Sequence, residues 1–147
     1  MELLPELQAK IRLARISDSP LNPEALRTAI GDPAGGATNL FIGTVRDHDE
    51  GRKVTNLSYS AHPSALERLT EILSQYAARP EVLAIGVEHR IGDLVVGDIA
   101  VIAGVTSAHR EAAFEVCSAL IERVKHEVPI WKNQIFVDGS NEWIGAS

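Results

Sequence analysis

The spacing of apolar positions changes several times along the chain, and each change marks an expected element. Short apolar runs, some continuous and some alternating, indicate strands at residues 10–16, 40–45, 54–59, 82–89, 99–105 and 130–137. Helices are expected at 22–30, 63–77 and 107–128, the first from its Asn-Pro-Glu start and the others from apolar residues at helical spacing. Glycine-aspartate pairs at 92–93 and 97–98 predict an antiparallel pairing of the strands at 82–89 and 99–105. This order predicts an α+β fold, a single domain over 1–147 with a largely antiparallel sheet and three helices.

The last helix has recognisable signals at both ends. Ser107 is a candidate N-cap, and Pro129 is expected to end the helix near Val128 because proline has no N–H donor. One stripe of the helix is apolar, at Ala113, Phe114, Cys117, Leu120, Ile121 and Val124. We expect this stripe to face the core.

Two basic residues at the start of this helix are candidates for binding an anion. Arg110 falls within the apolar stripe and His109 at its edge, where the free N–H groups of a helix start also favour negative charge. The alternative is structural: Arg110 pairs with a buried carboxylate and His109 is a core histidine. From these residues alone, the structural alternative is the stronger one.

Two lysines at the end of the helix are candidates for catalysis. If the strand at 130–137 turns back along the helix, Lys125 and Lys132 face one pocket. Neighbouring ammonium groups and partial burial both lower a lysine pKa, which yields a usable base or nucleophile. The alternatives are that Lys125 compensates the helix dipole and that Lys132 covers the ring of Trp131.

Other polar residues add little to this picture. The segment 46–53 is expected to be a solvated, mobile loop, because its adjacent acidic and histidine side chains lack the spacing of a metal ligand set. Arg46 is the exception, since it directly follows a buried strand. The lone cysteine, Cys117, is expected to be a core thiol, and neither a metal nor another cofactor is predicted.

Composition excludes several classes of protein. The 147 residues carry a net charge of −6 without a long basic run, which disfavours a nonspecific nucleic-acid binder. No apolar run approaches the ~20 residues of a membrane span, and the first residues do not form a signal peptide. A cytoplasmic protein that does not contact the membrane is expected.

Several ordered motifs together resemble one family. Two of them are H-R-x-x-A-F-x-x-C-x-x-x-I-x-x-x-K and the P-I-W-K that follows it, and two more are F-I-G-T-V-R at 41–46 and H-R-I-G-D-L-x-V-G-D at 89–98. Together they are similar to the large, catalytic subunit of molybdopterin synthase, the MoaE family. With a closing tryptophan at Trp143, the resemblance extends over residues 36–143. It implies a hammerhead-like arrangement of helices over the sheet.

The resemblance also implies an activity. It is sulfur transfer from the C-terminal Gly-Gly thiocarboxylate of a small ubiquitin-like subunit to cyclic pyranopterin monophosphate, forming the dithiolene of molybdopterin. Lys125 is then the main catalytic amine and Lys132 supports it, while Arg46, His109 and Arg110 hold the pterin phosphate. The family also implies a homodimer within a heterotetramer, in which His109 and Arg110 come from the second copy.

Three positions depart from the family pattern. Ser60 stands where the family usually has an acidic residue, and Asn133 and Gln134 stand where it usually has a basic and an acidic one. They leave open a paralogue with lower activity or another partner. Two alternatives to the enzyme also remain, a non-catalytic scaffold that binds the partner's tail and a small anion-binding domain.

Overall fold

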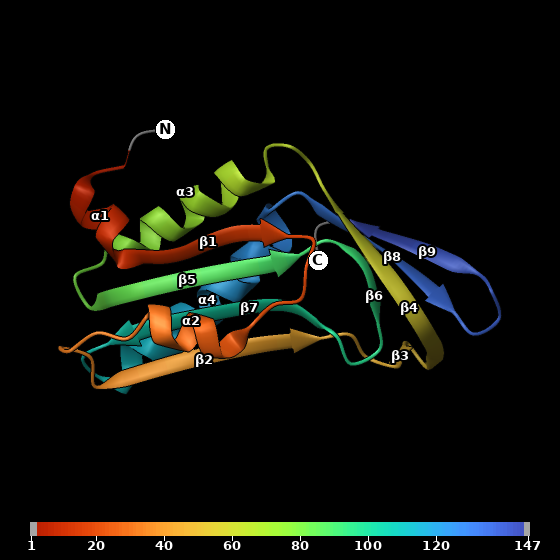
Figure 1. Ribbon diagram of the computed structural model, residues 1–147, viewed down its shortest axis with the longest axis horizontal. Helices are drawn as coiled ribbons and strands as arrows, with labels where there is room; N and C mark the ends of the chain where they lie inside the picture. The colour runs from red at the N-terminus through yellow and green to blue at the C-terminus, as the bar shows by residue number, and fades with distance from the viewer. Residues whose placement is uncertain (1–2, 146–147) are drawn as a thin grey trace.

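Two β-sheets lie side by side in the computed structural model, which describes residues 3–145 (Figure 1). The first sheet has the strand order β1-β5-β7-β2, with β1 at Ile11–Ser17, β5 at Val82–Arg90, β7 at Ile99–Ser107 and β2 at Ala37–Thr44. β5 and β7 pair antiparallel, as the two glycine-aspartate turns predicted, and β7 and β2 do the same. Only β1 runs parallel to its neighbour, β5.

The second sheet has the order β3-β4-β8-β9, with β3 at His48–Asp49, β4 at Arg52–Ala61, β8 at Ile130–Phe136 and β9 at Asn141–Gly145. A short strand, β6 at Gly92–Val95, also pairs with β4. The pairing of β4 with β8 places Tyr59 opposite Lys132. This pairing brings the C-terminal part of the chain back against its middle.

Helices cover both faces of the first sheet. α3 (Ala65–Ala77) and α4 (Arg110–Glu127) pack on one face and enclose the main core, while α2 (Pro23–Ala29) lies on the other (Figure 1). A six-residue helix, α1 (Pro5–Lys10), packs beside α3 and β5. Asn22 caps α2 as expected, because its side-chain oxygen accepts hydrogen bonds from the amides of Glu24 and Ala25.

α2 lies close to the sheet because two glycines face it. A Cβ on Gly86 would come within 2.8 Å of Leu26, and one on Gly104 within 2.5 Å of Ile30. The two glycines are direct partners across β5 and β7. Leu26 and Ile30 can therefore be completely buried, with an exposed fraction of 0% for each.

The expected α+β class with a largely antiparallel arrangement is confirmed. α1, β6 and β9 were not predicted, since each is too short to give a distinct apolar period. The buried stripe of α4 includes Val116 in place of Phe114, which is 59% exposed, because α4 packs against α3 as well as the sheet. Within residues 3–145, no helix is long and apolar enough to cross a membrane.

The burial of α4 predicts a stability difference between two leucines. Leu120 is 0% exposed within the main core, so Leu120→Ala is expected to lower the free energy of unfolding by about 2–5 kcal/mol. Leu66 on α3 is 46% exposed, and Leu66→Ala is expected to change that free energy by less than about 0.5 kcal/mol. Denaturant unfolding of both variants measures the difference, and equal losses would contradict the packing described here.

Candidate active site

A cavity of about 380 Å³ lies where the first sheet meets the second. Its apolar wall includes Phe41, Val101, Ile121, Val124 and Ile130. Its polar lining consists of Thr44, Arg46, Tyr59, His89, Lys125 and Lys132. Three of the five residues predicted for the site, Arg46, Lys125 and Lys132, therefore share one cavity.

The two lysines meet because the chain reverses sharply after α4. Lys125 lies in the last turn of the helix, with its Nζ 5.8 Å from the centroid of the Phe41 ring. Only Val128 and Pro129 separate the end of α4 from the start of β8. Lys132 is the third residue of β8 and lines the same cavity, as the sequence predicted for a strand returning along the helix.

The environment of Lys132 lowers the pKa of its amine. Burial is the largest effect and lowers the pKa of its side chain, because a charged amine loses solvation there. Asp49 opposes this effect by raising the pKa, whereas the positive charges of Lys125 and Arg46 lower it further. Glu142 adds a smaller opposing contribution to the pKa.

Two lining residues, Tyr59 and His89, were not among the predicted site residues. Their rings meet edge to face with centroids 4.9 Å apart. His89 is 8% exposed, and this burial lowers the pKa of its ring. Its Nδ1–H donates a hydrogen bond to the carbonyl of Arg90 at 2.7 Å. A carbonyl can only accept, so the neutral ring keeps Nε2 as an unprotonated acceptor. The sequence signal available for this residue was its place, after Glu88, at the end of a strand whose first six residues are apolar or glycine.

The polar segment that contains Arg46 is more ordered than the sequence predicted. It was expected to be a mobile loop, but His48–Asp49 form β3 and pair with Arg52 and Lys53 of β4. Glu50 and Gly51 connect the strands with positive φ angles of 49° and 79°, the conformation of a tight two-residue hairpin. Arg46 is 66% exposed, and its guanidinium donates to Asp49 Oδ1 at 3.3 Å.

His109 and Arg110 lie away from the lysines within one chain. They line a second cavity, with Glu111 and Phe114, at the N-terminal end of α4. Both are exposed, and within residues 3–145 no carboxylate pairs with Arg110, so the structural alternative for this arginine is wrong for a single chain. Along α4, 15 residues at 1.5 Å each separate Arg110 from Lys125 by about 22 Å.

The start of α4 also differs from the prediction. The N-cap is His109, without a side-chain hydrogen bond, whereas Ser107 is the last residue of β7 and is fully buried. The Ser107 hydroxyl donates to the carbonyl of His109 at 2.5 Å. Ser107 therefore stabilises the connection between β7 and α4 instead of capping the helix.

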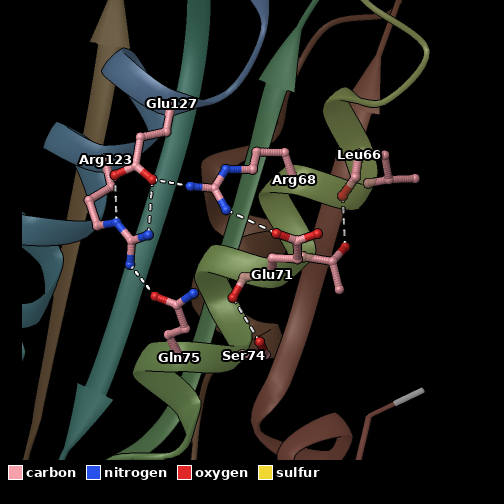
Figure 2. A network of polar contacts seen from close by, with 8 residues as sticks. Leu66, Arg68, Glu71, Ser74, Gln75, Arg123 and Glu127 are labelled. Carbon is pink, nitrogen blue, oxygen red and sulfur yellow. Dashed lines mark hydrogen bonds and ion pairs between the residues drawn. The ribbon is translucent and has the colours of Figure 1, made fainter. Parts of the chain in front are cut away.

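An ionic network fixes the other end of α4 against α3 (Figure 2). The Glu127 carboxylate accepts hydrogen bonds from both Arg123 and Arg68, and Arg123 also donates to Gln75 at 2.6 Å. The bond from Arg123 is the main reason that the pKa of Glu127 is lowered. The network joins the two helices within two residues of Lys125.

The cysteine and the metal-ligating side chains of the described residues are not arranged as a catalytic thiol or a metal site. Cys117 is 2% exposed, and burial raises the pKa of its thiol to about 11, so it is protonated and inaccessible near neutral pH. No cluster of three or more metal-ligating side chains occurs in the described part of the chain. The polar groups of the cavity are two amines, a guanidinium, an imidazole, a phenol and the hydroxyl of Thr44.

The three positions that depart from the family pattern differ in their distance from the site. Ser60 is exposed on β4 opposite Trp131, and the Asn133 Oδ1 is buried without a hydrogen-bond partner among the described residues. Gln134 is 4% exposed and donates to Asp49 Oδ2 at 2.8 Å. Through Asp49, Gln134 is connected to the site.

Comparisons with known proteins show what the chain is similar to. The sequence profile described as MoaE protein matches residues 16–127. Molybdopterin synthase catalytic subunit 1 of Mycobacterium tuberculosis is 39% identical over 132 residues, which span 89% of each chain. The molybdopterin synthase catalytic subunit of Bacillus subtilis is 39% identical over 131 residues, 88% of this chain and 83% of the relative.

A solved structure gives the same result at the level of the fold. The crystal structure of molybdopterin synthase from Staphylococcus aureus superposes with a TM-score of 0.81 at 36% identity, covering 88% of this chain and 95% of that one. The profile match covers most of the sequence, and the relatives match it over nearly their whole length. The chain therefore belongs to the MoaE family.

Proposed function

We propose that this chain is the catalytic subunit of a molybdopterin synthase, an enzyme of molybdenum cofactor biosynthesis. In this role it transfers sulfur from the C-terminal thiocarboxylate of a small ubiquitin-like subunit to cyclic pyranopterin monophosphate and so forms the dithiolene. The observation that carries the proposal is the convergence of Lys125, Lys132 and Arg46 on one cavity in a chain of this family. The free, buried cysteine is consistent with a cytoplasmic location.

The cavity favours both of the proposed ligands. Its amines and guanidinium attract a phosphate and a thiocarboxylate, and Arg46 supplies the planar donors that bind phosphate oxygens well. The apolar wall of Phe41, Ile121 and Val124 leaves room for an extended glycine tail. Because Cys117 is buried and protonated, the sulfur is brought by the partner.

The roles of the lysines follow from their positions. Lys125, at the margin of the apolar wall, is the main amine and lies closest to the partner's terminal glycine in this proposal. The thiocarboxylate sulfur forms a bond to the substrate and displaces an oxygen substituent there. Lys125 then assists the breaking of the acyl carbon–sulfur bond, by proton transfer to an attacking water or by accepting the acyl group itself. Lys132, which is more buried, supports it with a proton-accepting amine.

A second copy of the chain completes the site. His109 and Arg110 are too far from Lys125 in one chain to contact the same small substrate. Their side chains are exposed, and neither forms an ion pair with another residue in the described range 3–145. In a homodimer they extend into the partner copy's cavity and bind the pterin phosphate. Two catalytic chains with two small subunits make the heterotetramer.

Removal of the main amine is expected to abolish turnover. Lys125→Ala should lower dithiolene formation from cyclic pyranopterin monophosphate and a thiocarboxylated small subunit by at least about a hundredfold, the usual contribution of acid–base catalysis. Lys53→Ala, an exposed lysine on β4, is the matched control and should retain wild-type activity. Turnover by Lys125→Ala within a few-fold of wild type would favour the non-catalytic scaffold.

Mixed dimers test whether the site is shared between copies. Lys125→Ala and Arg110→Ala chains with different tags are co-expressed, and dimers that carry both tags are purified. If Arg110 acts across the interface, each mixed dimer has one intact site of two and about half of the wild-type activity. Each variant alone should be nearly inactive, and a mixed dimer as inactive as both parents would show that Arg110 acts within its own chain.

The environment of Lys132 predicts its titration behaviour. Because burial lowers its pKa, the amine loses its proton at a lower pH than an ordinary lysine, and its neutral fraction is higher at any pH below that range. Competitive acetylation across a pH series, mapped by mass spectrometry, measures this midpoint, with Lys132→Arg to identify the peptide. A midpoint at or above that of free lysine would contradict the buried site.

A further inference from the structure

The Asp49 carboxylate lies between two parts of the candidate site. Its Oδ2 accepts a hydrogen bond from Gln134 at 2.8 Å, and its Oδ1 accepts one from Arg46 at 3.3 Å. Gln134 follows Lys132 by two residues on β8, so both side chains point to the same face of that strand. Asp49 thus connects the strand that carries Lys132 to the arginine at the edge of the cavity.

The position of Asp49 is fixed by local structure. It ends β3 and pairs with Arg52 across the two-residue turn formed by Glu50 and Gly51, both at positive φ. This type of turn matches the twist of the flanking strands and holds them in one register. Its side chain is only 23% exposed, and both of its oxygens have partners.

Asp49 is also the main negative charge acting on Lys132. The charged groups around this amine are Asp49, Lys125, Arg46 and Glu142, in order of decreasing effect. Tyr59 lies opposite Lys132 in the strand pairing, and His89 packs against Tyr59. Burial raises the pKa of Tyr59 and lowers that of His89, so both are uncharged near neutral pH.

We propose that Asp49 is a positioning residue of this site, which holds Arg46 at the cavity and offsets the positive charge around Lys132 without touching the substrate. This inference rests on the proposed function and deepens it. Without the carboxylate, three cationic side chains would face the cavity, and Glu142 would be the remaining negative charge that acts on Lys132 among the described residues. Arg46, which is 66% exposed, would also lose the contact that restricts its rotamers.

The hydrogen-bonded pair needs one carboxylate and one amide. In this chain, the carboxylate is on β3 and the amide on β8. Exchanging them as Asp49→Asn with Gln134→Glu keeps the pair and the net charge but moves the carboxylate to β8. The exchange therefore separates the effect of charge from the effect of an unpaired buried group.

The test combines a titration with kinetics. Asp49→Asn should shift the acetylation midpoint of Lys132 to lower pH, because the ion that stabilises the charged amine is gone. It should raise KM for the pterin substrate by roughly three- to tenfold, because Arg46 is no longer oriented. The double exchange should return the Lys132 midpoint toward the wild-type value.

A neighbouring carboxylate provides the matched control. Asp47 is 75% exposed and pairs with His48, so Asp47→Asn should leave both the midpoint and KM unchanged. Thermal unfolding of each variant identifies a general loss of structure. If Asp49→Asn keeps the wild-type midpoint and KM, or if Asp47→Asn changes them equally, Asp49 is not a positioning residue.

The titration needs neither substrate nor small subunit. If the wild-type protein forms no dithiolene, the proposed function fails, but the midpoints of Asp49→Asn and the double exchange still decide whether Asp49 acts on Lys132. If the wild type is active and the midpoints do not differ, only the role of Asp49 fails.

Discussion

Burial of one face of α4 is the interaction on which the candidate site depends. Val116, Leu120 and Val124 are removed from water against the first sheet and α3, and this fixes both the rotation of the helix and the place where it ends. Lys125 is thereby held at the margin of the apolar face. Because Pro129 stops the helix and β8 follows at once, the same burial also determines where Lys132 emerges. The ionic network around Glu127 adds a second attachment at this end, so the amines are carried by rigid elements.

The electrostatics of the cavity are those of a site that is incomplete without an anion. Positive groups enter from α4, from β8 and from the segment after β2, and their mutual repulsion is unfavourable in a half-buried space. Asp49 offsets part of this repulsion through a short, ordered hairpin. Burial shifts the remaining balance toward a neutral Lys132, and an anionic substrate relieves repulsion that the fold itself leaves in place. Binding of such a ligand is favoured by charges that are already in position.

Sequence reasoning succeeded where the determining interactions are local. The helical period around Leu120, the stop at Pro129 and the short connection to β8 are all visible in the sequence, so the convergence of Lys125 and Lys132 was predicted. Tyr59 and His89 were missed because their approach depends on the register between strands and on the contact between two sheets, which no periodicity encodes. The sequence predicted a mobile loop around Asp49, although the Glu-Gly turn that orders it lies within the next two residues. The distance between Arg110 and Lys125 follows from helix geometry, but what fills the space around Arg110 depends on a second chain.

The burial of Cys117 has a practical consequence for handling the protein. Its thiol is the only one in the chain and is both protonated and shielded near neutral pH, so the folded subunit presents no reactive sulfur of its own. Alkylating reagents added to a reconstituted mixture will therefore label the sulfur carried by the small subunit with little background from this one. The decrease of this label on the small subunit, in samples alkylated at successive times, then measures the rate at which sulfur leaves its carrier. This measurement does not require isolation of the unstable pterin product.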